Sequence, residues 1–296
     1  MTDKTIFIVN PHAGRGKTKK KIPRLTNLLD KYNFNYDIVL TSHRSHAISL
    51  TRSFINKGYL RIIAVGGDGT INEVINGVMQ SDHTNRTLVG IIPMGGGNDF
   101  IKNFNFSSNL EDNVRIIEKG HIEKIDAVKF GNQYFINSLG LGFDALVAKN
   151  AGKIRYFNGQ IRYLISLIGS IFRLKNFKLR LKTENKIISC QTYLISVSKS
   201  KSIGGGFMLT PNARPYNNVI DVCIIKKAKL FRLAEIIFTV LKGDELDYSE
   251  VKYLRSREMD IRLATKQPLY YDGEVMKKDV KEVKIELSNQ KINLIC

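Results

Sequence analysis

Apolar runs alternate with helical stretches through the first 124 residues of the chain. Four runs are typical of buried strands and are centred on Ile6, on residues 36–40, on Ile62 and on Ile91. Strands that alternate with helices form βα units, which assemble into a parallel sheet covered by helices on both faces. The pattern therefore predicts a three-layer α/β domain over residues 1–124.

From Ile125 onward, short runs alternate between apolar and polar positions. They occupy residues 134–137, 177–181, 193–197, 219–225, 259–263 and 283–287. A period of two is typical of half-buried antiparallel strands. We expect residues 125–290 to form an antiparallel β-sandwich domain, interrupted by helices around residues 156–172 and 230–241.

A glycine-rich turn joins an apolar run to a helical stretch at residues 65–70. Its sequence is Val-Gly-Gly-Asp-Gly-Thr, with Asp68 as the acidic residue. Glycines let backbone N–H groups approach phosphate oxygens, the following helix adds a partial positive charge, and a carboxylate can hold Mg²⁺. The turn is a candidate phosphate site. A tight structural turn in which Asp68 only caps the helix is the alternative.

Two further glycine loops follow apolar runs in the first half, at residues 10–18 and 95–100. The first lacks the Gly-x-x-x-x-Gly-Lys-[Ser/Thr] spacing of a P-loop, so Lys17 is not assigned to a phosphate. The carboxyl ends of parallel strands meet at one edge of a sheet, where open α/β folds bind ligands. We therefore expect the glycine loops to lie together.

A separate turn far along the chain, Asp272-Gly273-Glu274, places two carboxylates on either side of a glycine. Asp-Gly is a common hairpin dipeptide, so a plain turn is the alternative to a functional one.

Taken together and in order, these segments resemble the bacterial diacylglycerol kinase and sphingosine kinase family of soluble lipid kinases. The resemblance spans nearly the whole chain and rests on residues 10–17, 66–73, 95–100, 137–144, 204–206 with 211–213, and 272–274. The Gly-Gly-Asp-Gly loop alone is less specific, because it also looks like that of NAD kinases and 6-phosphofructokinases. The resemblance implies a nucleotide-binding first domain, an active site in the interdomain cleft, and a final strand at 291–296 that returns to the first domain.

The resemblance also implies ATP and Mg²⁺ as cofactors. The residues that would bind ATP are Asn10, Pro11, His12, Ala13, Gly14, Thr41, Gly66, Gly67, Asp68, Gly69, Thr70, Asn72, Glu73 and Gly96. Asp68 and Asp99 are the candidates to hold Mg²⁺, because hard cations choose carboxylates. Glu274 is the favoured base for the lipid hydroxyl, with Asp272 as the other candidate, and Asp68 completes the catalytic set.

Diacylglycerol kinases of this type often bind a structural Mg²⁺ at the position of Asn217, with Arg214 and Val219 as carbonyl donors. An amide here replaces the usual carboxylate, and an uncharged ligand should lower the affinity for a hard cation. Gly96 likewise stands where many relatives have Thr, which removes a hydroxyl that could contact phosphate. The first departure weakens both the expectation of a second metal and the assignment to diacylglycerol.

The chain carries a formal net charge of +19, from 46 Lys and Arg against 27 Asp and Glu among 296 residues. Such a charge attracts nucleotide phosphates, nucleic acid or an anionic membrane, and it also favours solubility. Cys190, Cys223 and Cys296 show no paired spacing, which argues against a disulfide framework and a cysteine zinc site and fits a reducing cytosol. No secretory signal is visible.

The most apolar helical stretch, residues 161–172, is too short to span a bilayer. Residues 153–173 combine apolar bulk with cationic flanks, which is one way for a helix to lie on a membrane. We favour the alternative, in which this helix covers the β-sandwich, because a wide apolar stripe usually faces a core.

We expect a cytoplasmic lipid kinase, peripherally associated with an anionic membrane, that transfers the γ-phosphate of ATP to a lipid hydroxyl. Diacylglycerol, converted to phosphatidic acid, is the leading acceptor, and a sphingoid base or other lipid alcohol is the runner-up. An NAD kinase, or a non-enzymatic basic protein that binds nucleic acid or membrane, fits the sequence less well. We expect no nucleic-acid partner, and a homodimer is left open.

Overall fold

The computed structural model describes residues 2–152, 154, 159–171, 173–204, 206–244 and 246–296. The chain divides into two compact units, which we call the first unit (Met1–Ala127 and Asn289–Cys296) and the second unit (Val128–Ser288). Within the described ranges, no helix is long and apolar enough to cross a membrane.

Strands and helices alternate in the first unit. In chain order its elements are β1 (Thr2–Val9), α1 (Lys17–Lys31), β2 (Tyr36–Leu40), α2 (His46–Asn56), β3 (Tyr59–Gly66), α3 (Asp68–Met79), the 3₁₀ turn η1 (Thr84–Arg86), β4 (Leu88–Pro93), the 3₁₀ turn η2 (Phe100–Asn103), α4 (Leu110–Lys119) and the start of β5 (Ile122–Phe130).

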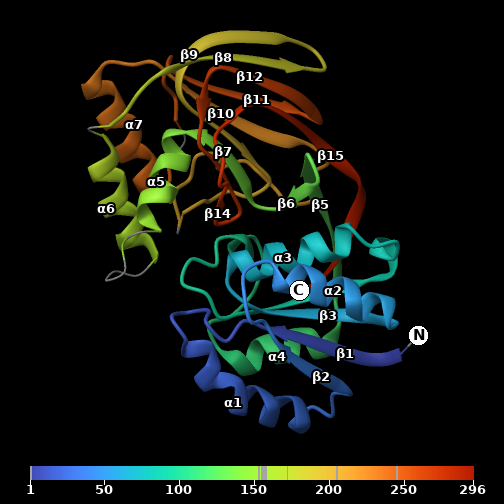
Figure 1. The fold of residues 1–296 in the computed structure, drawn as a ribbon. Helices are drawn as coiled ribbons and strands as arrows, with labels where there is room; N and C mark the ends of the chain where they lie inside the picture. The colour runs from blue at the N-terminus through green and yellow to red at the C-terminus, as the bar shows by residue number, and fades with distance from the viewer. Residues whose placement is uncertain (1, 153, 155–158, 172, 205, 245) are drawn as a thin grey trace. The chain divides into compact units, whose positions relative to one another are not determined.

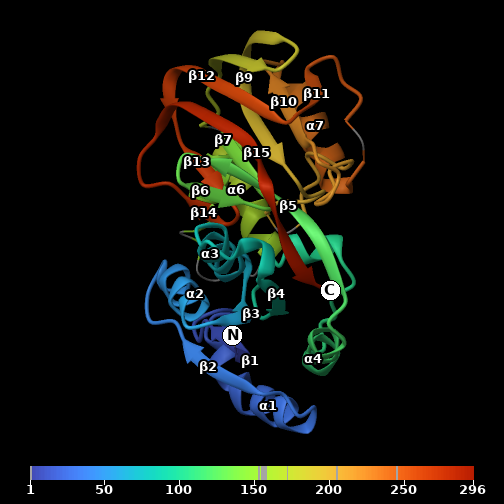
Figure 2. The same ribbon diagram turned by 90° about the vertical axis from the view of Figure 1, so that its right-hand side faces the viewer.

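The first unit is built on parallel strands in the order β15–β4–β3–β1–β2, where β15 (Val280–Ile295) supplies its last residues. Figure 2 shows β15 ending in red beside β4. Residues 6–9 of β1 are all fully buried, because helices cover both faces of the sheet. Phe7 and Val9 pack with α1 and α4, whereas α2 and α3 lie together on the opposite face (Figure 1).

Antiparallel strands dominate the second unit. After β5 its elements are β6 (Gln133–Phe135), β7 (Ser138–Gly142), α5 (Phe143–Ala151), α6 (Gly159–Ile171), β8 (Phe177–Thr183), β9 (Ile187–Ser198), β10 (Ile220–Lys226), α7 (Leu230–Lys242), β11 (Val251–Ser256), β12 (Glu258–Gln267), β13 (Leu269–Tyr271), β14 (Glu274–Val275) and most of β15.

The strands of the second unit follow the order β14–β13–β7–β9–β8–β12–β15, and β10 and β11 extend from β9. Strand β8 alternates strictly, with Phe177, Leu179 and Leu181 buried and the residues between them exposed. This period of two follows from one face packing on the core while the other meets water. The α/β plus antiparallel β fold class predicted from the sequence is confirmed.

Helices α5, α6 and α7 gather on one side of the second unit (Figure 1). Tyr163 and Leu167 of α6 pack on an apolar cluster shared with Leu233 and Ile236 of α7. The expected helix over the β-sheet is therefore present, although residues 153, 155–158 and 172 of the predicted stretch lie outside the described residues. The outer face of α6 stays exposed at Ile161, Leu164, Ile165 and Ile168.

Candidate active site

Two glycine turns of the first unit touch through their backbones. Gly66 ends β3 and Gly67 is the N-cap of α3, while Gly95 follows β4. A Cβ atom on Gly95 would lie 2.5 Å from Gly67 Cα, and one on Gly66 would lie 2.4 Å from Thr70 Oγ1. Side chains do not fit at Gly66 and Gly95, so the two turns can lie this close only because these residues are glycines.

The loop after β1 joins the same edge of the sheet. Asn10 donates from Nδ2 to Thr70 Oγ1 at 3.0 Å and accepts at Oδ1 from the backbone N–H of His12. Gly14 has a φ of +58°, and a Cβ atom there would lie 2.6 Å from the Met94 carbonyl. The structure therefore brings together the three loops that follow β1, β3 and β4, as the sequence predicts for a parallel sheet.

The carboxylates of Asp68 and Asp99 both lie near Gly97, at the same edge of the sheet. A Cβ atom on Gly97 would lie 3.2 Å from Asp68 Oδ2 and 3.7 Å from Asp99 Oδ2. Asp68 is the first residue of α3, and its Oδ1 accepts from the Phe100 N–H at 3.3 Å. Asp99 is buried and its Oδ1 accepts from Lys102 Nζ at 2.6 Å.

Lys102 takes only Oδ1 of Asp99, and the Oδ2 atoms of Asp68 and Asp99 both lie near Gly97. These two oxygens fit a Mg²⁺ ion, which proteins commonly bind through one or two carboxylates while substrate phosphates and water complete the shell. Asp68 and Asp99 are the residues that would hold it. Among the described residues, no group of three or more His, Cys, Asp or Glu side chains could hold a metal by itself. A metal here would therefore depend on the nucleotide for its remaining ligands.

The remaining predicted nucleotide residues of the first unit have varied surroundings. Thr41 is buried directly after β2, and Asn72 is buried inside α3, where its Oδ1 accepts from Asn76. Glu73 accepts from the backbone N–H groups of Ser45 at 2.7 Å and Ala47 at 3.1 Å. Glu73 therefore stabilises the N-terminus of α2, which is a structural role. The other positions lie in or next to the loops already described: Pro11, His12, Ala13, Gly69 and Gly96.

The two carboxylates of the second unit have different surroundings. Asp272 lies in the hairpin turn between β13 and β14 with a φ of +40°, and it is 2 % exposed. Its Oδ1 accepts from the N–H groups of Asn137 and Ser138, and its Oδ2 from that of Ile136 at 2.8 Å. Asp272 thus fastens the turn to the β6–β7 connection. Glu274 is half-buried at the start of β14.

Three backbone donors already occupy three of the roughly four lone-pair sites of Asp272, which makes it a poor acceptor for a substrate proton. Asp272 instead positions the turn that carries Glu274, and the choice of Glu274 as the base stays a prediction. The sequence predicted both residues but could not separate these roles, because the partners of Asp272 lie more than 130 residues away.

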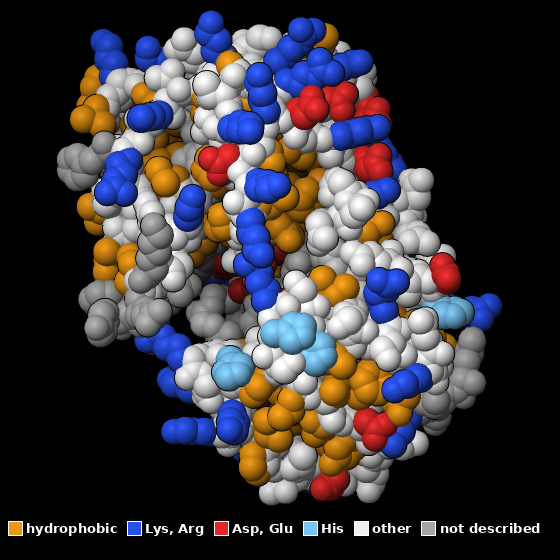
Figure 3. All heavy atoms as spheres, in the orientation of Figure 1, with side chains coloured by type: hydrophobic (Ala, Val, Ile, Leu, Met, Phe, Trp, Pro, Cys, Tyr) orange, Lys and Arg blue, Asp and Glu red, His pale blue; other side chains and the backbone are white. Residues whose placement is uncertain are grey.

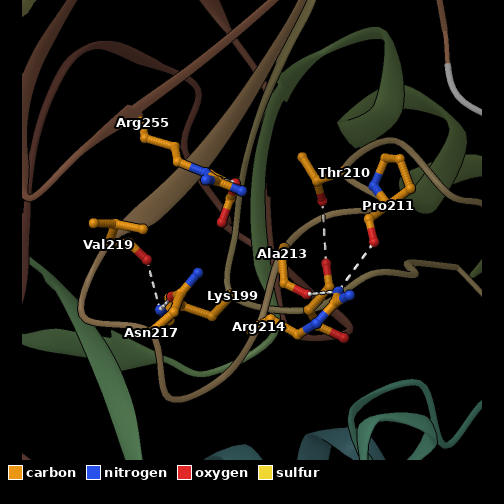
Figure 4. A network of polar contacts seen from close by, with 10 residues as sticks. Lys199, Thr210, Pro211, Ala213, Arg214, Asn217, Val219 and Arg255 are labelled. Atoms are coloured by element: carbon orange, nitrogen blue, oxygen red, sulfur yellow. Dashed lines mark hydrogen bonds and ion pairs between the residues drawn. The ribbon is translucent and has the colours of Figure 1, made fainter.

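Two of the three oxygens expected at the second metal site, those of Asn217 and Val219, accept from a protein cation. Lys199 Nζ lies 2.6 Å from Asn217 Oδ1 and 2.5 Å from the Val219 carbonyl. Arg214 donates from Nη1 to the carbonyls of Pro211 and Ala213, as Figure 4 shows. Lys199 could not be assigned to this segment from the sequence, since a lysine after a strand normally indicates a solvated side chain.

An apolar cavity lies between α5, α6, α7 and the strands beneath them. The empty space in and around it amounts to about 720 Å³, open solvent included. Phe143, Leu167, Phe207 and Ile236 are among its lining residues. The sequence did not predict this cavity, because its walls come from separate elements.

Asp144, at the start of α5, stands at the wall of this cavity. Both of its carboxylate oxygens are buried without a hydrogen-bond partner of good geometry among the described residues. Burial raises the pKa of Asp144 to about 8, and the nearby N–H of Ala145 offsets only part of that effect. Asp144 is therefore mostly protonated at neutral pH.

Two family models together cover nearly the whole chain. The diacylglycerol kinase catalytic domain matches residues 4–130, and the YegS C-terminal NAD kinase beta sandwich-like domain matches residues 137–296. The chain belongs to the diacylglycerol kinase family. As a member of that family it is a lipid kinase, a phosphotransferase with an alcohol group as acceptor.

Curated relatives support the membership over most of their own length. The diacylglycerol kinase of Staphylococcus carnosus (strain TM300) is 27 % identical over 275 residues, which is 93 % of this chain and 89 % of that protein. The diacylglycerol kinase of Staphylococcus haemolyticus (strain JCSC1435) is 28 % identical over 269 residues, 90 % of this chain and 81 % of that protein.

Solved structures show the same fold. A crystal structure of a diacylglycerol kinase from Bacillus anthracis str. Sterne superposes with a TM-score of 0.76 at 20 % identity, covering 100 % of this chain and 98 % of that one. Another crystal structure from the same organism gives a TM-score of 0.83 at 22 % identity, covering 99 % and 95 %. The resemblance predicted from the ordered motifs is therefore confirmed at the level of family and fold.

Proposed function

We propose that this protein transfers the γ-phosphate of ATP to the hydroxyl group of diacylglycerol and forms phosphatidic acid. The observation that carries the proposal is the convergence of three glycine loops and two carboxylates, Asp68 and Asp99, at one edge of the parallel sheet. Backbone amides suit phosphate oxygens, and paired carboxylates suit the magnesium ion that accompanies a nucleotide.

Phosphoryl transfer depends mainly on positioning and on neutralising charge. The amides of Gly66, Gly67 and Gly95 would hold the phosphates of ATP. Mg²⁺, when bound at Asp68 and Asp99, would supply positive charge beside the transferred group.

Glu274 would accept the proton of the acceptor hydroxyl as its oxygen bonds to the γ-phosphorus and the bond to the leaving ADP oxygen breaks. Asp272 would keep Glu274 in place through the three backbone hydrogen bonds that fix the hairpin turn. These are positioning and proton-transfer roles for side chains that the second unit supplies.

A lipid acceptor agrees with the apolar features of the second unit. The cavity bounded by α5, α6 and α7 has walls suited to hydrocarbon, since apolar side chains line nearly all of it. We propose that it receives part of an acyl chain. Burying each CH₂ group there would contribute about 0.8 kcal/mol.

We further propose that the outer faces of α6 and α7 contact an anionic membrane. Leu230, Phe231, Phe238 and Leu241 are exposed on α7, with Phe231 at 60 % and Phe238 at 59 %. Lys242 lies 4.6 Å from the Phe238 ring centroid, and Lys227 and Lys229 are exposed just before the helix. Apolar side chains beside cations are the combination that binds the surface of anionic lipid.

In Figure 3, apolar side chains lie along the edge formed by α6 and α7, and Lys and Arg outnumber Asp and Glu over the visible face of the second unit. The net charge of +19 also favours binding to an anionic membrane. This supports a protein that works at a membrane surface without spanning it.

Transfer from radiolabelled ATP to mixed micelles tests the function. Micelles containing dioleoylglycerol or sphingosine, and free NAD, are compared as acceptors. We expect labelled phosphatidic acid, and a loss of at least about a hundredfold in Asp68→Ala and in Glu274→Ala, as for removal of a positioned acid–base group. Asp279→Ala, an exposed carboxylate near the same hairpin, is the matched control.

Each different outcome has a definite meaning. Label on sphingosine alone would assign a sphingoid base as acceptor, and label on NAD would make the protein an NAD kinase. Full transfer by Asp68→Ala would contradict the role of the glycine loops.

A further inference from the structure

The whole Lys199 side chain lies inside the second unit. The residue follows β9 directly, and its backbone N–H donates to the Asn137 carbonyl at 2.8 Å. The side chain is 0 % exposed. Its ammonium nitrogen lies 2.6 Å from Asn217 Oδ1 and 2.5 Å from the Val219 carbonyl oxygen (Figure 4). One buried cation therefore satisfies two oxygen acceptors in the segment that leads into β10.

These two oxygens belong to the structural Mg²⁺ site that the family resemblance implies, together with the Arg214 carbonyl. Magnesium needs oxygen ligands at about 2.0–2.1 Å in near-octahedral geometry. An ammonium group that already donates to the same oxygens occupies the space a metal would need, and its charge repels a second cation. The residues present therefore do not fit a divalent metal.

Other cationic side chains face oxygens of the same segment. Arg214 Nη1 lies 3.2 Å from the Pro211 carbonyl and 2.9 Å from that of Ala213. Arg255 donates from Nε to Asp221 Oδ1 at 2.8 Å. The protein thus supplies positive charge at two carbonyls of this segment and at Asp221, the second residue of β10.

We propose that the Lys199 ammonium is a tethered cation that clamps the 199–219 segment, and that this segment binds no divalent metal. Ser198 pairs with Asp221 across β9 and β10. The clamp therefore acts where the segment leaves the sheet and where it returns. Because a tethered cation cannot dissociate, the order of the segment does not depend on the metal concentration.

Asp221 Oδ2 is an atom at which a metal ion could still bind near this segment. This oxygen is buried and has no hydrogen-bond partner among the described residues, although the carboxylate is paired with Arg255. The test therefore includes a variant of Asp221 as well as one of Asn217.

Thermal unfolding of the full chain without nucleotide, in millimolar MgCl₂, in millimolar CaCl₂ and in EDTA, tests the clamp. All proteins carry Asp68→Ala, so that the site in the first unit does not contribute. The parent is compared with Lys199→Ala, with the double variant Lys199→Ala/Asn217→Asp, and with Lys201→Ala. The last is a matched control, because Lys201 is a partly exposed lysine two residues away.

We expect the parent to unfold at the same temperature in all three solutions. Lys199→Ala should lower the Tm by about 4–8 °C, because it leaves two buried acceptors unsatisfied, whereas Lys201→Ala should change it little. The double variant restores a carboxylate and removes the competing ammonium, so part of the lost Tm should return only when Mg²⁺ or Ca²⁺ is added.

Two results would overturn the proposal. One is a metal-dependent rise in the Tm of the parent that disappears in Asn217→Ala or Asp221→Asn. The other is a Lys199→Ala variant as stable as Lys201→Ala. If Lys199→Ala does not fold, titration of the parent with Mn²⁺ followed by electron paramagnetic resonance decides, with no bound Mn²⁺ expected and one tight site contradicting the clamp.

Discussion

Gly67 and Gly95 lie back to back, so close that a Cβ atom on Gly95 would fall 2.5 Å from Gly67 Cα. Gly67 precedes α3 and Gly95 follows β4, so this contact sets the spacing between two of the loops that we assign to phosphate binding. The loops can approach this closely only because neither residue carries a side chain.

Gly95→Ala should therefore push the two loops apart and reduce the affinity for ATP by at least about tenfold, which corresponds to 1.4 kcal/mol of binding free energy. Gly169→Ala is the control, because a Cβ atom there would meet nothing within 4 Å and Gly169 lies in α6, outside the glycine loops. Equilibrium binding of a fluorescent ATP analogue measures both. Equal affinities in the two variants would show that the spacing of the loops does not matter for nucleotide binding.

The sequence predicts most of the first unit because its physical signals are local. Residues 6–9 form a continuous apolar run, which a strand buried on both faces requires. The glycine turns follow such runs directly, so their meeting at one sheet edge follows from the parallel arrangement alone.

The features that the sequence could not predict depend on distant partners. Nothing in the sequence around Lys199 distinguishes it from a solvated surface lysine. Only the fold brings its partners Asn217 and Val219 close to it. Residues 137–144 form one motif, but the structure divides them between β7 and α5, and burial of Asp144 results from packing that no local pattern records.

Converting Asp272 and Glu274 each to the corresponding amide should distinguish the structural role of Asp272 from the catalytic role of Glu274. Asp272→Asn replaces an acceptor oxygen with an NH₂ group that faces backbone donors, so it should lower the free energy of unfolding by about 2–4 kcal/mol. Glu274→Gln should leave stability nearly unchanged and lower transfer at least about a hundredfold. Urea unfolding and the phosphoryl-transfer assay measure the two effects.

The assignment of the base depends on that separation. If Asp272→Asn were fully stable and inactive while Glu274→Gln kept its activity, the base would be Asp272. Loss of both stability and activity in each variant would mean that the hairpin acts as one structural unit.

Replacing exposed aromatic residues on the outer face of α7 with aspartate should weaken membrane binding. Phe231→Asp and Phe238→Asp each remove an exposed ring and add a negative charge, beside Arg232 and beside Lys242 respectively. We expect binding to phosphatidylglycerol vesicles to fall at least about fivefold, through lost apolar contact and charge repulsion. Sedimentation with vesicles measures this, and raised salt should weaken binding of the unmodified protein by screening.

Ile187→Asp is the comparison for that experiment, since Ile187 is 55 % exposed at the start of β9 and away from the helices. An equal loss of vesicle binding in Ile187→Asp would indicate a general effect of charge rather than a surface on α7. Circular dichroism of each variant checks that the fold is retained.

The buried carboxyl of Asp144 should give the protein a particular dependence of stability on pH. Burial raises its pKa from the ordinary value of 3.8 to about 8 in the folded protein. Between those values the folded protein keeps a proton that the unfolded chain has released. The stabilisation tied to protonated Asp144 is therefore complete below about pH 4 and is lost as the pH rises through about 8.

Asp144→Asn stays neutral at every pH and so avoids that loss. Its Tm relative to the unmodified protein should rise between about pH 4 and pH 8 and then level off, with a total change in unfolding free energy of a few kcal/mol. Asp279→Asn, at an exposed position, should give a difference that hardly varies with pH. A flat difference for Asp144→Asn would mean that its carboxyl ionises freely in the folded protein, through water reaching the wall of the cavity or an approaching cation.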